Sequence, residues 1–176
     1  SRVMGKASEH ARDLMMEKGA EEVRAAGGRP YVISAGGSTP RGALGYVQAA
    51  IELDQQCRSL AVPVRCVGMV GAMGGTASGF IFGAAMLGHP FHVHVISVEY
   101  PGPVLRRILM DLCLRIEALV GWMPRVPVEE VMTIHDQYLG PGYAVPTETS
   151  RRAMFDLARH EGILTEDVYT SKTLGG

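Results

Sequence analysis

The sequence has few cysteines, almost no net charge and no long hydrophobic run. Its three cysteines, Cys57, Cys66 and Cys113, show no CxxC pairing, which argues against a disulfide framework or a structural zinc site. A net charge of −1 over 176 residues gives no electrostatic basis for binding nucleic acid or an anionic membrane. No apolar run reaches the length of about 18 residues that a membrane span requires. These absences favour a globular protein of a reducing compartment, the cytoplasm or an organelle, with no nucleic-acid partner and no membrane partner.

Lysine is also scarce, since only Lys6, Lys18 and Lys172 occur. Lys6 and Lys18 fall in a predicted helix over residues 5–26, where a charged side chain is usually solvated. The sequence does not begin with methionine, and it ends at residues 173–176 just inside what reads as a new helix. We therefore expect a piece of a longer protein, truncated at both ends.

What is present is an alternation of β-type and helix-type segments joined by short connections. Predicted strands cover residues 31–34, 65–70 and 91–98, with a partly extended segment at 128–134. Predicted helices cover residues 5–26, 41–53, 76–87, 103–120 and 147–160, with Thr39 and Thr147 as N-caps. The strands read as apolar throughout, which is typical of a parallel sheet covered on both faces. The sequence predicts an α/β fold with an open, mostly parallel sheet flanked by helices.

The most informative segment is GAMGGTASG at residues 71–79, between the strand at 65–70 and the helix at 76–87. A strand, a glycine-rich turn and a helix in this order form a phosphate receptor. The amides of the turn point inward, and the helix N-terminus adds partial positive charge. Because the turn contains no lysine or arginine, its amides, the helix dipole and the hydroxyls of Thr76 and Ser78 would have to hold the anion.

Three further segments complete a set with this turn: YVISAGGSTPRGALGY at residues 31–46, GPGYAVP at 140–146 and EGILTEDVYTSK at 161–172. In this order and spacing the set resembles the family of D-cysteine desulfhydrases and 1-aminocyclopropane-1-carboxylate (ACC) deaminases. These are pyridoxal 5'-phosphate enzymes of the tryptophan-synthase-β fold. The resemblance implies a pyridoxal phosphate cofactor, a small amino-acid substrate and a homodimer. It places residues 1–176 in the C-terminal half of such an enzyme, mostly within its large cofactor-binding domain.

The resemblance also implies roles for individual residues. The cofactor phosphate would bind at the turn, at Met73, Gly74, Gly75, Thr76 and Ala77. Tyr143 and Tyr169 match tyrosines on the substrate side of the cofactor, where a phenol of lowered pKa can orient substrate or pass protons. Without the resemblance, each tyrosine reads more simply as a half-buried packing residue with its hydroxyl hydrogen-bonded.

Thr170, which we also place among the cofactor-binding residues, distinguishes the two activities of the family. Deaminase-like members have glutamate at this position, and desulfhydrase-like members have serine or threonine. A carboxylate near the pyridine nitrogen would favour its protonated form and strengthen the ring as an electron sink, whereas a hydroxyl supplies no such charge. Loss of hydrosulfide needs less delocalisation than opening a cyclopropane ring. Thr170 therefore favours β-elimination from D-cysteine.

The chain departs from the family pattern at two points. Met73 replaces a small or hydroxylated residue, which removes a hydrogen-bond donor from the turn. The family's cofactor-bound lysine, in a Gly-Gly-Asn-Lys-type segment near the N-terminus, has no counterpart here, and Lys172 is not in that position. We therefore expect a D-cysteine desulfhydrase-like lyase as the parent protein and an inactive chain by itself.

Other interpretations stay open. The parent could open the ring of ACC or eliminate from another β-substituted D-amino acid. A different class is a non-catalytic module that binds a phosphorylated small molecule or stabilises a partner chain. His92 and His94 alternate on a strand and share a face, but no third ligand has suitable spacing, so we expect no metal site. His135 and Asp136 are adjacent on a loop, where two side chains rarely face each other as an acid–base pair.

Overall fold

The computed structural model describes residues 9–176, and the chain divides into two units, Ser1–Gly37 and Ser38–Gly176. The first unit contains helix α1 (Glu9–Ala25) and the short 3-10 helix η1 (Ala35–Gly37). Helix α1 confirms the predicted helix for the part that is described, and residues 5–8 lie outside the described residues.

The predicted strand at residues 31–34 is wrong. This segment forms no strand, and the side chains of Tyr31 and Ile33 are 81% and 69% exposed. A β-type run becomes a strand only where a neighbouring strand can bond to its backbone. The described part of the first unit contains no such neighbour.

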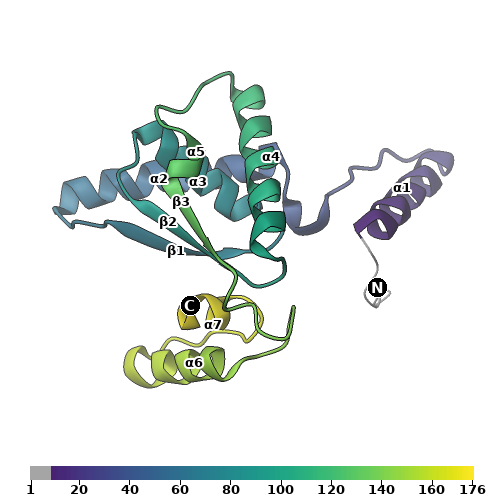
Figure 1. Ribbon diagram of the computed structural model, residues 1–176. Coiled ribbons are helices and arrows are strands. Elements are labelled where there is room, and N and C mark those ends of the chain that lie inside the picture. The colour runs from purple at the N-terminus through teal and green to yellow at the C-terminus, as the bar shows by residue number, and fades with distance from the viewer. Residues whose placement is uncertain (1–8) are drawn as a thin grey trace. The chain divides into compact units, whose positions relative to one another are not determined.

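The second unit contains the remaining elements in alternating order (Figure 1). Its strands are β1 (Cys66–Gly71), β2 (His92–Ser97) and β3 (Met132–His135). Its helices are α2 (Pro40–Leu60), α3 (Gly75–Leu87), α4 (Gly102–Val120), α5 (Val128–Val131), α6 (Glu148–Glu161) and α7 (Thr170–Gly175). None of the helices within residues 9–176 combines the length and the hydropathy needed to cross a membrane.

Two of these helices begin at the predicted caps. The Thr39 side chain accepts a hydrogen bond from the Gly42 amide at 3.0 Å, and Pro40 opens α2. The Thr147 side chain accepts one from the Ser150 amide at 3.1 Å, which starts α6. Helix α2 is longer than predicted and continues to Leu60.

The three strands form one parallel sheet in the order β1-β2-β3. Met69 pairs with Val95, and Val95 pairs with Ile134, so these side chains share one face of the sheet. Val93 and Val95 on this face are fully buried in the core that α3 and α4 complete. Figure 1 shows α3 and α4 on one side of the sheet and α6 and α7 on the other. The predicted α/β architecture with an open parallel sheet is confirmed.

Helix α3 lies at the centre of this core, and two glycines bring α2 against it. A Cβ on Gly79 would lie 2.2 Å from the Ala43 carbonyl oxygen. A Cβ on Gly83 would lie 2.8 Å from the Ala50 Cβ. Only glycine permits such an approach, and these contacts pack α2 closely against α3.

The opposite face of the sheet corrects the expectation of strands that are apolar throughout. His92 and His94 of β2 both point to this face and are only partly buried. The His94 Nδ1 atom lies 3.0 Å from Nε2 of His135, and Nε2 of His92 lies 2.8 Å from the Thr133 hydroxyl. These polar groups bond to one another across the strands. Within the described residues this face is therefore covered only in part, on the side where α7 packs against β1 and β2.

Candidate active site

The site begins at the turn between β1 and α3. Strand β1 ends at Gly71, and α3 begins at Gly75 after Gly74, which has a φ of 86°. A Cβ on Gly74 would lie 2.9 Å from the Ile108 Cγ2 atom, so both the backbone conformation and the space require glycine. The predicted strand–turn–helix unit is thus present, with the helix N-terminus at the carboxyl end of β1.

The first amides of α3 provide the groups that an anion would need. The Gly75 amide donates to the Ser38 hydroxyl at 3.2 Å, and the Ser78 amide closes the first helical bond to the Gly74 carbonyl at 2.8 Å. The amides of Thr76 and Ala77 receive no acceptor from the helix itself. The first turn contains no acidic residue, so nothing there neutralises the positive end of the helix dipole.

Ser78 does not have the role that the sequence suggested. Its side chain is fully buried, and its hydroxyl donates to the Leu109 carbonyl of α4 at 3.3 Å. Thr76 and Ser78 are two residues apart and so lie on nearly opposite sides of α3. The side chain of Ser78 therefore faces α4. The hydroxyl of Thr76, which is half-buried, remains the side-chain donor of the turn.

Met73 contacts a residue that sequence reasoning missed. The Tyr100 hydroxyl donates to the Met73 sulfur atom, with the two atoms 3.5 Å apart. A thioether is only a weak acceptor. Tyr100 follows the carboxyl end of β2, and no local sequence pattern links it to a turn 27 residues earlier. The contact brings a phenol against the side chain of Met73 in the β1–α3 turn.

Tyr143 and Tyr169 lie together, although 26 residues separate them in the sequence. Their hydroxyls are hydrogen-bonded to each other, and their rings meet edge to face with centroids 5.8 Å apart. The hydrogen bond with Tyr143 raises the pKa of Tyr169 to about 12, and partial burial and the carboxylates of Glu99 and Glu166 act in the same direction. Tyr169 therefore holds its proton at neutral pH, which differs from the lowered phenol pKa considered for proton transfer.

Glu166 holds the backbone around Tyr169. Its carboxylate accepts hydrogen bonds from the amides of Val168, Tyr169 and Thr170, at 2.6, 2.9 and 2.5 Å for the shortest of each. Partial burial alone would raise the pKa of Glu166, but these bonds outweigh it and lower that pKa. The nearby Thr170 hydroxyl acts in the same direction on the pKa of Glu166.

Lys172 lies on α7, three residues after Tyr169. Its side chain is 1% exposed, and its ammonium donates to the carbonyls of Leu139 and Gly142 at 2.9 and 2.8 Å. An amine so enclosed and so bonded is not placed to react with a cofactor aldehyde.

The turn and the tyrosines belong to the same end of the sheet. Tyr100, which contacts Met73, is adjacent in sequence to Glu99, whose charge acts on Tyr169. They are the second and third residues after the carboxyl end of β2. Among residues 9–176, no hydrogen bond joins either tyrosine to the turn itself. Tyr143 itself lies on the segment that follows the carboxyl end of β3, just as the turn follows the carboxyl end of β1.

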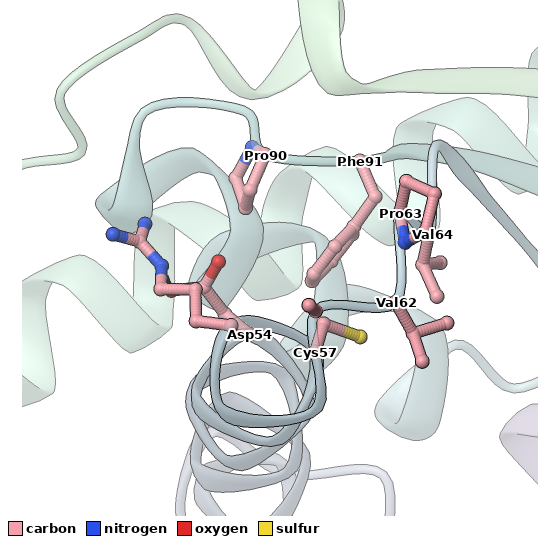
Figure 2. Close-up of a pocket in the computed structure, with 9 residues that line it drawn as sticks. Asp54, Cys57, Val62, Pro63, Val64, Pro90 and Phe91 are labelled. Atoms are coloured by element: carbon pink, nitrogen blue, oxygen red, sulfur yellow. Dashed lines mark ion pairs between the residues drawn. The ribbon is translucent and has the colours of Figure 1, made fainter.

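A separate groove of about 300 Å³ lies at the other end of the strands (Figure 2). Val64, which precedes β1, and Phe91, which precedes β2, line it together with Cys57 of α2. Asp54 also lines it and is bonded to Arg58 at 2.9 Å. Ligands of parallel sheets bind at the carboxyl ends of the strands, so this groove is not the candidate site. The described part of the chain also holds no group of three or more metal-ligating side chains suited to a metal ion.

The geometry thus defines a parallel α/β protein that presents amides and a helix N-terminus to an anion, with paired phenols at the same end of the sheet. This is the arrangement expected of an enzyme that holds a phosphorylated cofactor. The family model described as "Pyridoxal-phosphate dependent enzyme" matches residues 2–176. The chain belongs to this family.

Individual members of the family and a solved structure also resemble this chain. Two D-cysteine desulfhydrases of Klebsiella pneumoniae, from strain 342 and strain ATCC 700721, are 36% and 35% identical to this chain over 160 residues. The match covers 89% of this chain and 46% of each relative. A crystal structure of an ACC deaminase homologue superposes with a TM-score of 0.85 at 29% identity, covering 99% of this chain and 51% of that one. The expected fold is confirmed, and the chain spans about half the length of these relatives.

Proposed function

We propose that this chain is the C-terminal-half portion of a pyridoxal phosphate-dependent lyase that removes hydrosulfide from D-cysteine. The observation that carries the proposal is the hydrogen-bonded pair of Tyr143 and Tyr169 at the same end of the sheet as the β1–α3 turn. The desulfhydrase relatives support the choice of substrate class. Most of the chain would belong to the large cofactor-binding domain.

The β1–α3 turn fits a phosphate group. Gly74 has a positive φ and no room for a Cβ, so the backbone can approach a ligand closely. Ala77 is fully buried, and its amide needs an acceptor that the helix does not supply. Thr76 adds a hydroxyl, and Met73 and Gly75 complete the turn. Bound here, pyridoxal phosphate would supply the electron sink that stabilises negative charge at the substrate Cα.

The elimination step of the reaction breaks two bonds of D-cysteine, and hydrolysis then breaks the Cα–N bond. The Cα–H bond gives up its proton to a base, and the electron pair forms a Cα=Cβ bond as hydrosulfide leaves Cβ. The resulting enamine takes up water and yields pyruvate and ammonia. The products are therefore pyruvate, ammonia and hydrogen sulfide from one D-cysteine and one water molecule.

The two tyrosines would act on the substrate side. Tyr169 retains its proton because its pKa is about 12, so it serves as a hydrogen-bond donor that orients the substrate or protonates the leaving sulfur. Its hydroxyl bond to Tyr143 offers a path along which a proton can move between the phenols. We assign both as catalytic residues.

Thr170 bears on the alternative activity, deamination of ACC, which the solved ACC deaminase homologue brings into consideration. A threonine at this position supplies no negative charge to a pyridine nitrogen. A sink of moderate strength suffices to expel hydrosulfide, which is a good leaving group. Thr170 thus favours elimination over ring opening.

The lysine that binds the cofactor covalently would come from a segment outside this chain. Lys172 is enclosed and bonded to two carbonyls. We also propose that the parent protein is a homodimer in the cytoplasm or an organelle. The three cysteines are all free, as in a reducing compartment. Light scattering of the purified protein tests the dimer.

The deciding experiment is a product assay on the full-length protein that contains this chain. D-cysteine, L-cysteine and ACC are supplied in parallel with pyridoxal phosphate. We expect pyruvate and sulfide from D-cysteine and no 2-oxobutyrate from ACC. Formation of 2-oxobutyrate would establish the deaminase instead, and absence of any product with the cofactor bound would favour a non-catalytic module.

A further inference from the structure

Lys172 stands out because its charge is buried without a counter-charge. Asp54 and Lys172 are the two residues with charged side chains that are buried in the described part of the chain, at 8% and 1% exposure. Asp54 is paired with Arg58, whereas no ion pair among residues 9–176 includes Lys172. Burying an ammonium is costly unless it is hydrogen-bonded. An apolar side chain would fill the same space at lower cost, so the charge calls for an explanation.

The bonds of this ammonium reach one particular loop. Its two acceptors, the carbonyls of Leu139 and Gly142, lie on the segment between β3 and α6 that carries Tyr143. That segment has three residues with positive φ, Gly140, Gly142 and Ala144, and no regular secondary structure. Such a loop depends on bonds from outside itself to hold one conformation.

The other end of Lys172 is tied to the second tyrosine. Helix α7 begins at Thr170, directly after Tyr169, and the three amides bound by Glu166 fix the start of this helix. The Thr173 hydroxyl bonds to the Tyr169 carbonyl at 2.9 Å. Lys172 thus extends from the helix that begins beside Tyr169 to a loop that has no regular secondary structure.

We propose that Lys172 is a positioning residue whose ammonium ties the Tyr143 loop to α7 and so keeps the hydroxyls of Tyr143 and Tyr169 hydrogen-bonded. Charge-assisted bonds to two carbonyls 30 and 33 residues away are stronger than neutral ones. Burial lowers the pKa of Lys172, in keeping with the desolvation that these bonds offset. The catalytic consequence rests on the proposed function, but the link between Lys172 and the phenols does not.

The test compares Lys172→Met with the wild type in the full-length protein. Methionine keeps the length of the side chain and removes the ammonium. The readout is the titration of tyrosines labelled with ¹³C at Cζ, with Tyr169→Phe identifying the Tyr169 resonance. In wild type Tyr169 should titrate near pH 12. In Lys172→Met its pKa should fall towards the ordinary value of about 10, because the bond to Tyr143 is lost.

Activity gives a second readout. We expect kcat of Lys172→Met to fall by at least about tenfold, as for misplaced catalytic groups. Affinity for pyridoxal phosphate should stay within about twofold, because the amides of the β1–α3 turn, not Lys172, would hold the phosphate. Lys18→Met, at an exposed position of α1, is the matched control and should change neither quantity.

The titration needs no substrate, so it separates this inference from the proposed function. An unchanged Tyr169 pKa in a folded Lys172→Met protein would overturn it, whatever reaction the enzyme catalyses. If Lys172→Met does not fold, Lys172→Gln keeps a neutral N–H donor group without the charge and should lower the Tyr169 pKa by a smaller amount. Failure of both variants to fold would make Lys172 a residue of general stability and would also contradict the proposal.

Discussion

The β1–α3 turn and the Tyr143–Tyr169 pair are built in different ways. The turn is held by the main chain and by contacts that only glycine permits, at Gly74 and Gly79. The tyrosine pair is held by side chains that reach across the sequence, from Glu166 to the amides beside Tyr169 and from Lys172 to the Tyr143 loop.

In the proposed function, the turn is a rigid cofactor anchor and the tyrosine pair is an adjustable substrate side. Overpacking the turn should damage folding and cofactor binding together, because the same backbone serves both. Removing a side-chain bond near the tyrosines should reduce turnover and leave the anchor intact.

The largest effect is expected from Gly79→Val. A Cβ there would lie 2.2 Å from the Ala43 carbonyl oxygen, so α2 and α3 would have to separate. We expect a loss of about 3 kcal/mol in the free energy of unfolding, measured by denaturant titration of the full-length protein. Gly45→Val on α2 is the control, since nothing lies within 4 Å of its Cβ position, and it should be nearly neutral. Equal stability of the two variants would refute the close packing.

Gly74→Ala tests the anchor more locally. The φ of 86° costs a residue with a Cβ about 1–2 kcal/mol, and the new methyl would press on Ile108. We expect affinity for pyridoxal phosphate, followed by absorbance titration, to fall about tenfold or more. Gly121→Ala has a similar φ of 70° with open space around it and should cost stability without affecting the cofactor. Unaltered cofactor affinity in Gly74→Ala would place the phosphate elsewhere.

Glu166→Gln tests the substrate side. The neutral amide accepts weaker hydrogen bonds from the Val168, Tyr169 and Thr170 backbone than the carboxylate does. We expect kcat to fall severalfold while cofactor affinity is maintained. Asp167→Asn removes a neighbouring exposed charge and serves as the control. A selective loss of cofactor affinity in Glu166→Gln would show that the two regions are not separate.

The Glu166 carboxylate should also make the stability of the protein depend on pH. Because the amide bonds lower the pKa of Glu166 below its ordinary 4.5 in the folded state, its contribution to stability is complete above that value. It is lost as the pH falls through the folded-state pKa. The fall in unfolding free energy on acidification should therefore be smaller in Glu166→Gln than in wild type. Parallel curves for the two proteins would contradict this.

The smallest effect is expected at the histidines, which lie outside both regions. Burial lowers the pKa of His92, and the neighbouring charges of His94, His89 and His135 act in the same direction. The unfolded state then binds more protons than the folded state as the pH falls through about 6.5. Stability should decline slightly between neutral pH and pH 5, and less so in His92→Gln. An increase in the free energy of unfolding on acidification would contradict this prediction.

The sequence predicts the anchor better than the substrate side, because the anchor is local. The glycines of residues 71–79 sit between a strand and a helix, and the caps at Thr39 and Thr147 depend on neighbouring residues only. Only the family resemblance identified Tyr143 and Tyr169 as site residues. A local sequence pattern cannot predict a contact between residues that are 26 positions apart.

At other positions the contacts of the folded chain differ from what the sequence pattern predicts. Residues 31–34 have β-type side chains but no strand to pair with. Ser78 carries a hydroxyl in a glycine-rich turn, yet its position on α3 directs it to Leu109. Tyr100 and Lys172 act through partners 27 to 33 residues away, and only the folded chain identifies those partners.

The most direct test is a crystal structure of the full-length protein with pyridoxal phosphate bound. The phosphate should accept hydrogen bonds from the amides of Thr76 and Ala77, with the hydroxyls of Tyr143 and Tyr169 on the substrate side of the cofactor ring. A phosphate held by other residues, or a cofactor whose reactive side faces away from both phenols, would contradict the account.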